Sequence, residues 1–322
     1  AGWAERVLAG RTQPARIALP SGPMRLLVVT ARYPTADRPA AGAFVRERLR
    51  GAAATVIAPD RYDEPGWRRY LGLTWRAVRT RGAFDGVEGH FVLPSGVVAL
   101  LAARTRRLPL VVVAHGSDVR SIASRSGVHR WLARRVLNGA AAVVANSDDT
   151  AAAVRALGAE AEVVNPGIDL ERFVPAPRPA ERRVLYLGGA QAYKGVEVAR
   201  GLADTLLGPG LREIGPDDVP GVLAQHDVLL APSREEGFGL VAAEAIAAGR
   251  WVVAADIGGL RQVITDGVNG TLVRDADYAG ALASVPDYDP ATVAATAARF
   301  DVEQQRASMD AIWERVLARR GR

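Results

Sequence analysis

Short runs of branched apolar residues alternate with helix-forming segments along this chain. In the first half, the runs lie at residues 24–30, 54–59, 108–115, 141–147 and 161–166. Apolar runs of this length are typical of strands that are buried on both faces. The segments between them have helical patterns, and one of them, SDDTAAAVRALG, opens on capping residues and closes on glycine. Alternation of strand and helix predicts a parallel sheet that is covered by helices.

The alternation stops once and then restarts. Residues 169–183 are rich in proline and charge, which is the composition of a linker between domains. Further apolar runs follow, with the sequences VLYLG, DVLLAPS, WVVAAD and GTLV. A chain of 322 residues with 49% hydrophobic content is long enough for two domains of ordinary size. We therefore expect an α/β protein with two tandem Rossmann-like domains, at residues 24–168 and 184–300, each with a parallel sheet.

The two ends of the chain have different compositions. Residues 1–23 form an expected N-terminal extension that lacks the uninterrupted apolar stretch of a signal peptide. Residues 301–322 carry apolar side chains at helical spacing and predict a terminal helix that docks on an apolar surface. No apolar run reaches the ~18 residues that span a bilayer. Because cysteine is absent, disulfides and thiolate metal sites are excluded. We expect a cytoplasmic protein.

Charge is divided unevenly between the two halves. Residues 1–180 hold 26 arginines against 15 acidic residues, a balance of +11, whereas residues 181–322 hold 15 basic against 20 acidic residues, a balance of −5. The arginines are dispersed without a recognisable nucleic-acid-binding motif, so no nucleic-acid partner is expected. An anionic acceptor or an anionic membrane fits the basic half better.

Residues 66–80 extend this argument to membranes. On a helical wheel one side gathers arginines, namely Arg68, Arg69, Arg76 and Arg79. The other side gathers mainly aromatic and apolar residues, namely Trp67, Tyr70, Leu71, Trp75 and Val78. Such a helix either packs its aromatic side on the sheet or lies peripherally at the inner face of an anionic membrane.

Lys194 is the only lysine in the chain; the other 40 of the 41 basic residues are arginines. Lysine offers a compact ammonium where arginine offers a planar fork, so a site that needs a small cation would keep its lysine. Lys194 follows the run VLYLGG and is expected to open a helix that begins KGVEVA. Ligands of open parallel sheets bind beyond the carboxyl ends of the strands, where a helix N-terminus favours phosphate. The position predicts a phosphate site. Two alternatives are that a bias towards arginine left one surface lysine by chance, or that Lys194 forms a Schiff base with pyridoxal phosphate.

A second loop, at residues 231–249, leads from a strand through an acidic, glycine-containing turn into a helix. Gly237 and Gly239 allow backbone N–H groups to approach a ligand closely. Glu236 lies in the turn, and Glu244 follows eight residues later, about two helical turns along. The two carboxylates can therefore accept hydrogen bonds from hydroxyls at opposite ends of one elongated ligand. A nucleotide sugar has that shape.

These stretches resemble a known family. The sequence SREEGFGLVAAEAIAAG is similar to the signature of the retaining nucleotide-sugar glycosyltransferases of family 4, which have the GT-B fold. YKGVEVA lies where the KG helix of that family begins. HGSDV, VVNPGIDLERFVP, ADIGGLRQVITDGVNGTLV and ARYPTADRPAAGAFVRERL also resemble family segments, in the expected order, over residues 24–320. The resemblance implies a retaining enzyme that transfers a sugar from a nucleoside-diphosphate sugar to an acceptor held mainly by the N-terminal domain, without metal or cofactor.

The resemblance also implies roles for single residues. Lys194 would bind the donor diphosphate, Glu236 the hydroxyls of the donor sugar, and Glu244 the ribose. His115 matches a histidine near the transferred sugar, so the catalytic set would be His115, Lys194 and Glu236. Other expected donor-binding positions are the loop glycine Gly42, the remains of a base-binding loop at Ile214 and Gly215, and the start of the signature helix at Gly237, Phe238, Gly239 and Leu240. An ammonium and helix amides would stabilise the negative charge on the departing diphosphate.

Two features depart from the family pattern. Many relatives carry an arginine shortly before the lysine, and Gly189 stands there in this chain. The second domain is also trimmed, because few residues separate ARGLADTLLGPG from DVLLAPS. Both departures leave open a non-catalytic sugar-nucleotide-binding protein or a nucleotide-sugar epimerase of related fold. The acidic pair of DAD, at 275–277, is expected to cap a helix and not to bind metal.

Overall fold

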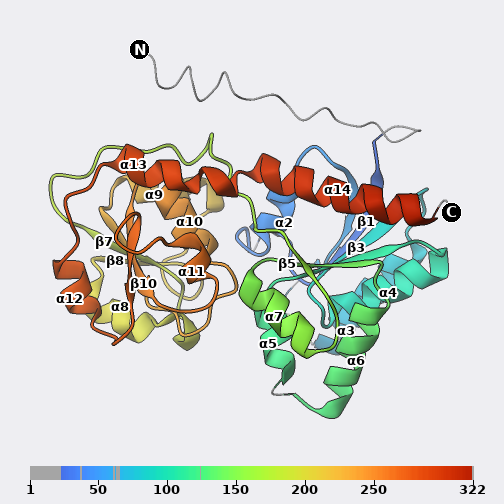
Figure 1. Ribbon diagram of the computed structural model, residues 1–322. Coiled ribbons are helices and arrows are strands. Elements are labelled where there is room, and N and C mark those ends of the chain that lie inside the picture. Colours follow the sequence, from blue (N-terminus) through green and yellow to red (C-terminus); the bar gives the residue numbers. More distant parts are fainter. Residues whose placement is uncertain (1–22, 37, 61, 63–65, 124, 321–322) are drawn as a thin grey trace.

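The computed structural model describes residues 23–320, except 37, 61, 63–65 and 124, and shows two lobes side by side (Figure 1). The expected extension at 1–23 lies almost entirely outside the described residues. Each lobe holds one sheet whose strands are all parallel. The expected α/β fold with two parallel sheets is therefore confirmed.

The first lobe contains a six-stranded sheet in the order β2-β1-β3-β4-β5-β6. Its strands are β1 Arg25–Thr30, β2 Ala53–Ile57, β3 Gly86–His90, β4 Leu110–Ala114, β5 Ala142–Ala145 and β6 Glu162–Val163. Its helices are α2 Ala43–Arg48, α3 Gly66–Arg79, α4 Ser95–Arg106, α5 Ser117–Ala123, α6 Gly127–Asn138 and α7 Asp148–Ala156. Ser147 caps α7 by accepting a hydrogen bond from the N–H of Thr150, as the capping pattern indicates.

The second lobe contains a five-stranded sheet in the order β11-β10-β9-β7-β8. Its strands are β7 Val184–Leu187, β8 Thr205–Leu207, β9 Val228–Ala231, β10 Trp251–Ala255 and β11 Gly270–Val273. Its helices are α8 Val196–Leu202, α9 Val219–Ala224, α10 Leu240–Ala247, α11 Leu260–Val263, α12 Tyr278–Ala283 and α13 Pro290–Ala295, with 3₁₀ turns at Ala192–Lys194, Pro216–Asp218 and Thr296–Phe300. Asp277 caps α12 through the N–H of Gly280, which confirms the expected cap.

Two strands were absent from the expected set. The residues of β3 have the sequence GVEGH and include a glutamate and a histidine, yet all five are buried between β1 and β4. β8 lies inside a segment that has no long apolar run. Between β8 and β9 the chain makes only a 3₁₀ turn and α9, so the second lobe is as short in this region as expected.

The terminal helix α14, Val302–Arg320, leads from the second lobe back over the first (Figure 1). Four of its five buried side chains join residues of β1, β4 and β5 in one apolar cluster, and they are Met309, Ile312, Trp313 and Val316. The surface on which this helix docks, which the sequence leaves open, is therefore the first sheet.

The linker between the sheets is fastened to the second lobe. Phe173 is buried in the second core. The guanidinium of Arg250, itself fully buried, donates hydrogen bonds to the backbone carbonyls of Ala176 and Pro177. The proline-rich segment is thus held against the domain that follows it.

Helix α3 packs differently from the helical-wheel expectation. Leu73 and Ala77 are its fully buried residues, whereas Trp75 is 60% exposed and Leu71 63%. The guanidinium of Arg79 lies 5.3 Å from the centre of the Trp75 ring. The side chain of Trp67 is outside what the structure describes. The expectation that the aromatic side packs on the sheet is therefore wrong at Trp75. No helix among the described residues is long and apolar enough to cross a bilayer.

Candidate functional site

Lys194 and Glu236 meet where two neighbouring strands of the second sheet end. Lys194 lies in the loop after β7 and Glu236 in the loop after β9, and their Nζ and Oε2 atoms are 2.5 Å apart. The two side chains are 25% and 19% exposed, so each still reaches solvent. Lys194 ends a 3₁₀ turn, and α8 begins only at Val196. The lysine therefore stands before a helix, as expected, but does not itself open it.

Gly195 explains how the two loops come so close. Its φ of +74° is a left-handed conformation that favours glycine. A side chain at this position would overlap the backbone carbonyl of Pro232, in the loop after β9. The backbone of the lysine loop therefore packs directly on the neighbouring loop, which places Lys194 beside Glu236.

The first turn of α10 forms the next wall of the site. Gly239 precedes it with a φ of +97°, and no side chain caps the turn. Glu236 bends back so that its Oε1 accepts a hydrogen bond of 3.2 Å from the N–H of Gly237. Phe238 is buried against Phe300, and Leu240 is half-buried. A helix start next to an ammonium is a suitable place for a negatively charged group.

The two lobes touch at this point. A Cβ on Gly237 would lie 2.5 Å from the backbone oxygen of His115, which follows β4 in the first sheet. A Cβ on Gly116 would likewise lie 2.9 Å from the Cα of Gly237. The His115 carbonyl also accepts a hydrogen bond of 3.1 Å from the side-chain amide of Asn146. The two glycines therefore allow the loop between β9 and α10, at residues 232–239, to reach His115 in the first lobe. We call this loop the signature loop.

Glu244 lies half-buried on α10. Burial raises the pKa of its carboxyl to about 7, while the positive charge of Arg172 acts in the opposite direction. The same Arg172 donates a hydrogen bond to the carbonyl of Pro216. It thus links the surroundings of Glu244 to the loop of Ile214 and Gly215. Ile214 packs half-buried against the second core, and the N–H of Gly215 bonds to Asp218.

Comparison with known proteins identifies the family of this chain. Residues 19–172 match the family described as Glycosyltransferase Family 4, and residues 170–285 match that described as Glycosyl transferases group 1. A protein of Kribbella flavida named D-inositol 3-phosphate glycosyltransferase is 33% identical over an alignment of 285 positions, and the match covers 68% of this chain and 67% of that protein. The chain belongs to the family 4 glycosyltransferases. A protein of the same name from Geodermatophilus obscurus is 35% identical over an alignment of 280 positions, and the match covers 66% of this chain and 62% of the relative. The chain thus spans about two thirds of the length of these family members.

Solved structures agree on the GT-B fold. HepE of Anabaena, in complex with UDP and glucose, superposes with a TM-score of 0.67 at 19% identity and covers 89% of this chain and 98% of that protein. The catalytic domain of starch synthase IV from Arabidopsis thaliana, bound to ADP and acarbose, gives a TM-score of 0.68 at 11% identity, covering 92% and 100%. At these identities the likeness shows the shared fold, and the site residues of this chain rest on their own geometry.

The structure gives a reason for Gly189, which stands where the family resemblance led us to expect an arginine. Gly189 has a φ of +77°, and a Cβ there would lie 2.7 Å from the side-chain oxygen of Gln191 and 2.8 Å from the carbonyl of Pro209. Its own carbonyl accepts a hydrogen bond of 2.9 Å from the hydroxyl of Tyr186. An arginine at this position would therefore need a different loop.

Gly42, the other glycine of the expected set, precedes α2 with a φ of +66°. A Cβ on it would overlap the backbone carbonyl of Arg32. Only glycine fits this turn without strain. The conformation explains the residue, and a role in approaching a diphosphate stays a prediction.

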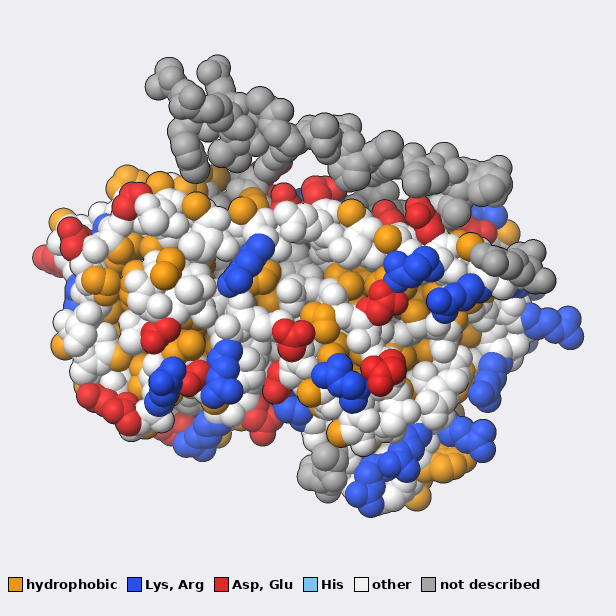
Figure 2. Space-filling view, viewed as in Figure 1, with side chains coloured by type: hydrophobic (Ala, Val, Ile, Leu, Met, Phe, Trp, Pro, Cys, Tyr) orange, Lys and Arg blue, Asp and Glu red, His pale blue; other side chains and the backbone are white. Residues whose placement is uncertain are grey.

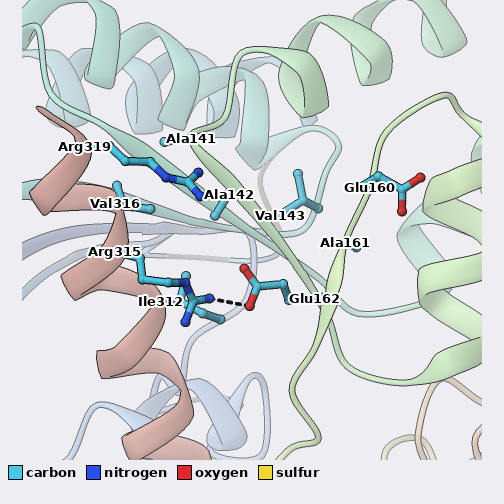
Figure 3. A pocket seen from close by; sticks show the side chains of 10 residues that line it. All are labelled: Ala141, Ala142, Val143, Glu160, Ala161, Glu162, Ile312, Arg315, Val316 and Arg319. Carbon is cyan, nitrogen blue, oxygen red and sulfur yellow. Dashed lines mark hydrogen bonds and ion pairs between the residues drawn. The ribbon is translucent and has the colours of Figure 1, made fainter.

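A cavity of about 350 Å³ lies away from these residues, between the start of β5, the edge strand β6 and α14 (Figure 3). Arg315 reaches across it and pairs with Glu162. Ala142, at the start of β5, pairs with Val111, whereas His115 follows the far end of β4. The cavity is therefore at the amino ends of the strands, opposite the edge where parallel sheets bind ligands.

Sequence reasoning missed two polar residues behind His115. His90, at the end of β3, has its Nδ1 3.0 Å from Nε2 of His115, and Glu88 on the same strand lies 2.8 Å from the other nitrogen of His90. The alternation of Glu88 and His90 in GVEGH was a usable signal, because it places both side chains on one face of a strand.

Proposed function

We propose that this chain is a retaining glycosyltransferase that moves a sugar from a nucleoside-diphosphate sugar to an acceptor bound mainly by the first lobe. The observation that carries the proposal is the pairing of Lys194 with Glu236 beside the start of α10, in contact with the His115 backbone of the other lobe. The curated relatives are named for glycosyl transfer, and one structural neighbour, HepE of Anabaena, has been solved in complex with UDP and with UDP-glucose.

The reaction separates charge, and the site matches that separation. As the bond between the anomeric carbon and the diphosphate oxygen breaks, positive charge grows on the sugar and negative charge on the leaving group. The Lys194 ammonium has three donors, of which Glu236 occupies one, so the others can bind phosphate oxygens. Glu236 keeps acceptor capacity for sugar hydroxyls, and the uncapped amides of α10 lie beside it.

The acceptor hydroxyl then attacks the anomeric carbon from the face that the diphosphate leaves. Its proton passes to the departing phosphate oxygen, and the new linkage keeps the configuration of the donor. No metal or cofactor takes part in this proposal. His115, at the junction of the lobes, lies next to the transferred sugar.

The acceptor proposed here carries negative charge. The first 180 residues have a net charge of +11, and the curated relatives are named after inositol 3-phosphate, a polyol that carries a phosphate. An inositol phosphate is therefore the first acceptor class to test, ahead of glycans and lipid-linked sugars.

A thermal-shift screen with UDP-, GDP-, ADP- and TDP-sugars tests the donor, followed by turnover with inositol phosphates. We expect one nucleotide class to raise the melting temperature and the product to keep the anomeric configuration, as seen by NMR. An inverted linkage would rule out the retaining reaction. Binding without turnover would favour a non-catalytic sugar-nucleotide-binding protein, which the glycine at 189 makes the second candidate, and donor consumption without acceptor would indicate an epimerase.

A further inference from the structure

Three charged or titratable side chains are buried behind His115, in the core of the first lobe. Glu88 and His90 come from β3 and are 0% and 1% exposed, and Arg48, at the end of α2, is 8% exposed. Burying such groups is unfavourable unless each finds a partner. They take no part in the chemistry proposed above. Their hydrogen bonds form one continuous series that ends on His115.

Glu88 lies at the centre of this series of hydrogen bonds. Its Oε1 accepts hydrogen bonds from the guanidinium of Arg48 and, at 2.8 Å, from Nε2 of His90. Its Oε2 accepts a hydrogen bond of 3.1 Å from the indole N–H of Trp313, on α14. Three donors converge on the two oxygens, so Glu88 acts as an acceptor-only carboxylate. This fixes the proton on Nε2 of His90.

The direction of the next hydrogen bond follows. A neutral histidine that is protonated on Nε2 has a lone pair on Nδ1. Nδ1 of His90 lies 3.0 Å from Nε2 of His115, so the proton between them belongs to Nε2 of His115. Burial is the main reason why the pKa of each histidine lies well below its ordinary value, and the nearby Arg48 acts in the same direction. Both rings are therefore neutral at physiological pH.

The ring of His115 is also held in place. Its centre lies 4.5 Å from that of Phe91 and 4.8 Å from that of Phe44, and it stacks on His90 at 5.2 Å. Its backbone N–H donates a hydrogen bond of 3.0 Å to Asp118. The cavity beside the two histidine rings is only about 20 Å³, which is too small for a sugar. Ring orientation and tautomer are thus set by the protein.

We propose that Glu88 and His90 are positioning residues that hold His115 as its Nε2–H tautomer and so present Nδ1 as a hydrogen-bond acceptor to a hydroxyl of the transferred sugar. The identity of that ligand rests on the function proposed above, whereas the tautomer does not. An acceptor nitrogen selects a hydroxyl over a phosphate oxygen, which needs a donor. A neutral ring also avoids placing a cation beside the positive charge that develops on the sugar.

The first experiment measures the tautomer in the free protein, by long-range proton–nitrogen NMR of ¹⁵N-histidine-labelled chain. We expect His115 to carry its proton on Nε2. His90→Phe keeps an aromatic ring but removes the acceptor, so His115 should then populate both tautomers. His115 protonated on Nδ1 in the wild type, or a tautomer unchanged in His90→Phe, would overturn the proposal.

The second experiment links the tautomer to turnover. His90→Phe should lower kcat with the donor found by the screen by about tenfold, the effect of one hydrogen bond, and leave the Kd of UDP unchanged. His129→Phe is the matched control, because His129 lies on α6 and bonds only Ser126 among the described contacts. An equal loss of UDP binding in His90→Phe, or a full kcat, would contradict positioning. Absence of turnover in the wild type would instead refute the proposed function and leave the tautomer result intact.

Discussion

In the proposed donor site, the Lys194 ammonium is the group expected to bind the diphosphate. Because Lys194 Nζ lies 2.5 Å from Glu236 between two packed loops, the larger guanidinium fork cannot occupy the same place. We expect Lys194→Arg to lower kcat by about a hundredfold although the charge is kept. Steady-state rates of the variant measure this. Arg200→Lys, on the exposed side of α8, is the control, and near-normal turnover in Lys194→Arg would make the unique lysine incidental.

We expect Glu244 to make donor binding depend on pH. Its folded-state pKa of about 7, raised by burial, means that the carboxyl is largely protonated below that pH. If its carboxylate accepts the ribose hydroxyls, donor affinity should rise with pH between about 6 and 8, by at most about tenfold per pH unit below the pKa. Calorimetry with a UDP-sugar measures this, since the donor's diphosphate does not titrate in that range.

The same shift has a consequence for stability. A carboxyl whose pKa is higher in the folded than in the unfolded state stabilises fully below the unfolded value and loses that contribution as pH rises through about 7. Glu244→Gln should therefore flatten both the affinity profile and the stability profile across this window. A steep affinity profile that persists in Glu244→Gln would assign the titration to another group.

At the scale of residues, the sequence predicted those whose role depends on a local pattern. Lys194 and Glu236 stand in loops that follow apolar strands, and such loops gather at one edge of a parallel sheet. Their direct contact could not be predicted, because it depends on Gly195 packing against Pro232. Glu88 and His90 escaped notice because their partners are 40, 25 and 225 residues away along the chain.

At the scale of elements, apolar runs identified the strands that need no polar partner. β3 was missed because a glutamate and a histidine within five residues contradict the pattern of a buried strand. Arg48 on α2 and Trp313 on α14 donate hydrogen bonds to the buried Glu88 and so offset the cost of its burial. The sequence around β3 does not predict these two distant partners. Glu88 and His90 thus make β3 hard to recognise as a buried strand, and they are also the two residues proposed to position His115.

Helices α3 and α6 each expose a tryptophan beside an arginine. Trp75 and Trp131 are 60% and 54% exposed, and Arg79 and Arg135 lie over their rings at 5.3 and 5.2 Å. Figure 2 shows basic side chains around hydrophobic ones at the lower end of the first lobe, where Figure 1 places α6. Exposed tryptophan with arginine is the composition of surfaces that bind anionic membranes.

We expect Trp75→Glu/Trp131→Glu to abolish sedimentation with anionic vesicles, while Val268→Glu, an exposed apolar position of the second lobe, leaves it unchanged. Salt should weaken wild-type binding, by roughly 1 kcal/mol per arginine engaged. Arg76 is unsuitable for this test because it holds α3 to Asp60 and to the carbonyl of Ala58. No binding of the wild type at low salt would leave this surface to a soluble acceptor.

At the scale of the whole molecule, two of the contacts that join the two lobes bear directly on His115. Helix α14 returns from the second lobe to the first, where Trp313 reaches Glu88. The signature loop meets the end of β4 through Gly237 and Gly116. The first link completes the series of hydrogen bonds that is proposed to fix the tautomer of His115, and the second brings the signature loop against the His115 backbone. The sequence predicted a docked terminal helix, but it did not predict that Trp313 on this helix would contact Glu88.

A substitution at Gly237 tests the approach of the two lobes separately from donor binding. A methyl group there would lie 2.5 Å from the His115 carbonyl, so Gly237→Ala must push the loop and β4 apart. Because Lys194, Glu236 and Glu244 all belong to the second lobe, UDP affinity should stay within about twofold, while kcat falls by about tenfold or more. Calorimetry and steady-state rates measure the two effects, and X-ray scattering should show a larger radius of gyration. Gly201→Ala, on α8 with open space around it, is the control. If Gly237→Ala instead weakened UDP binding as much as turnover, the glycine would serve the donor directly, and the approach of the lobes would not depend on it.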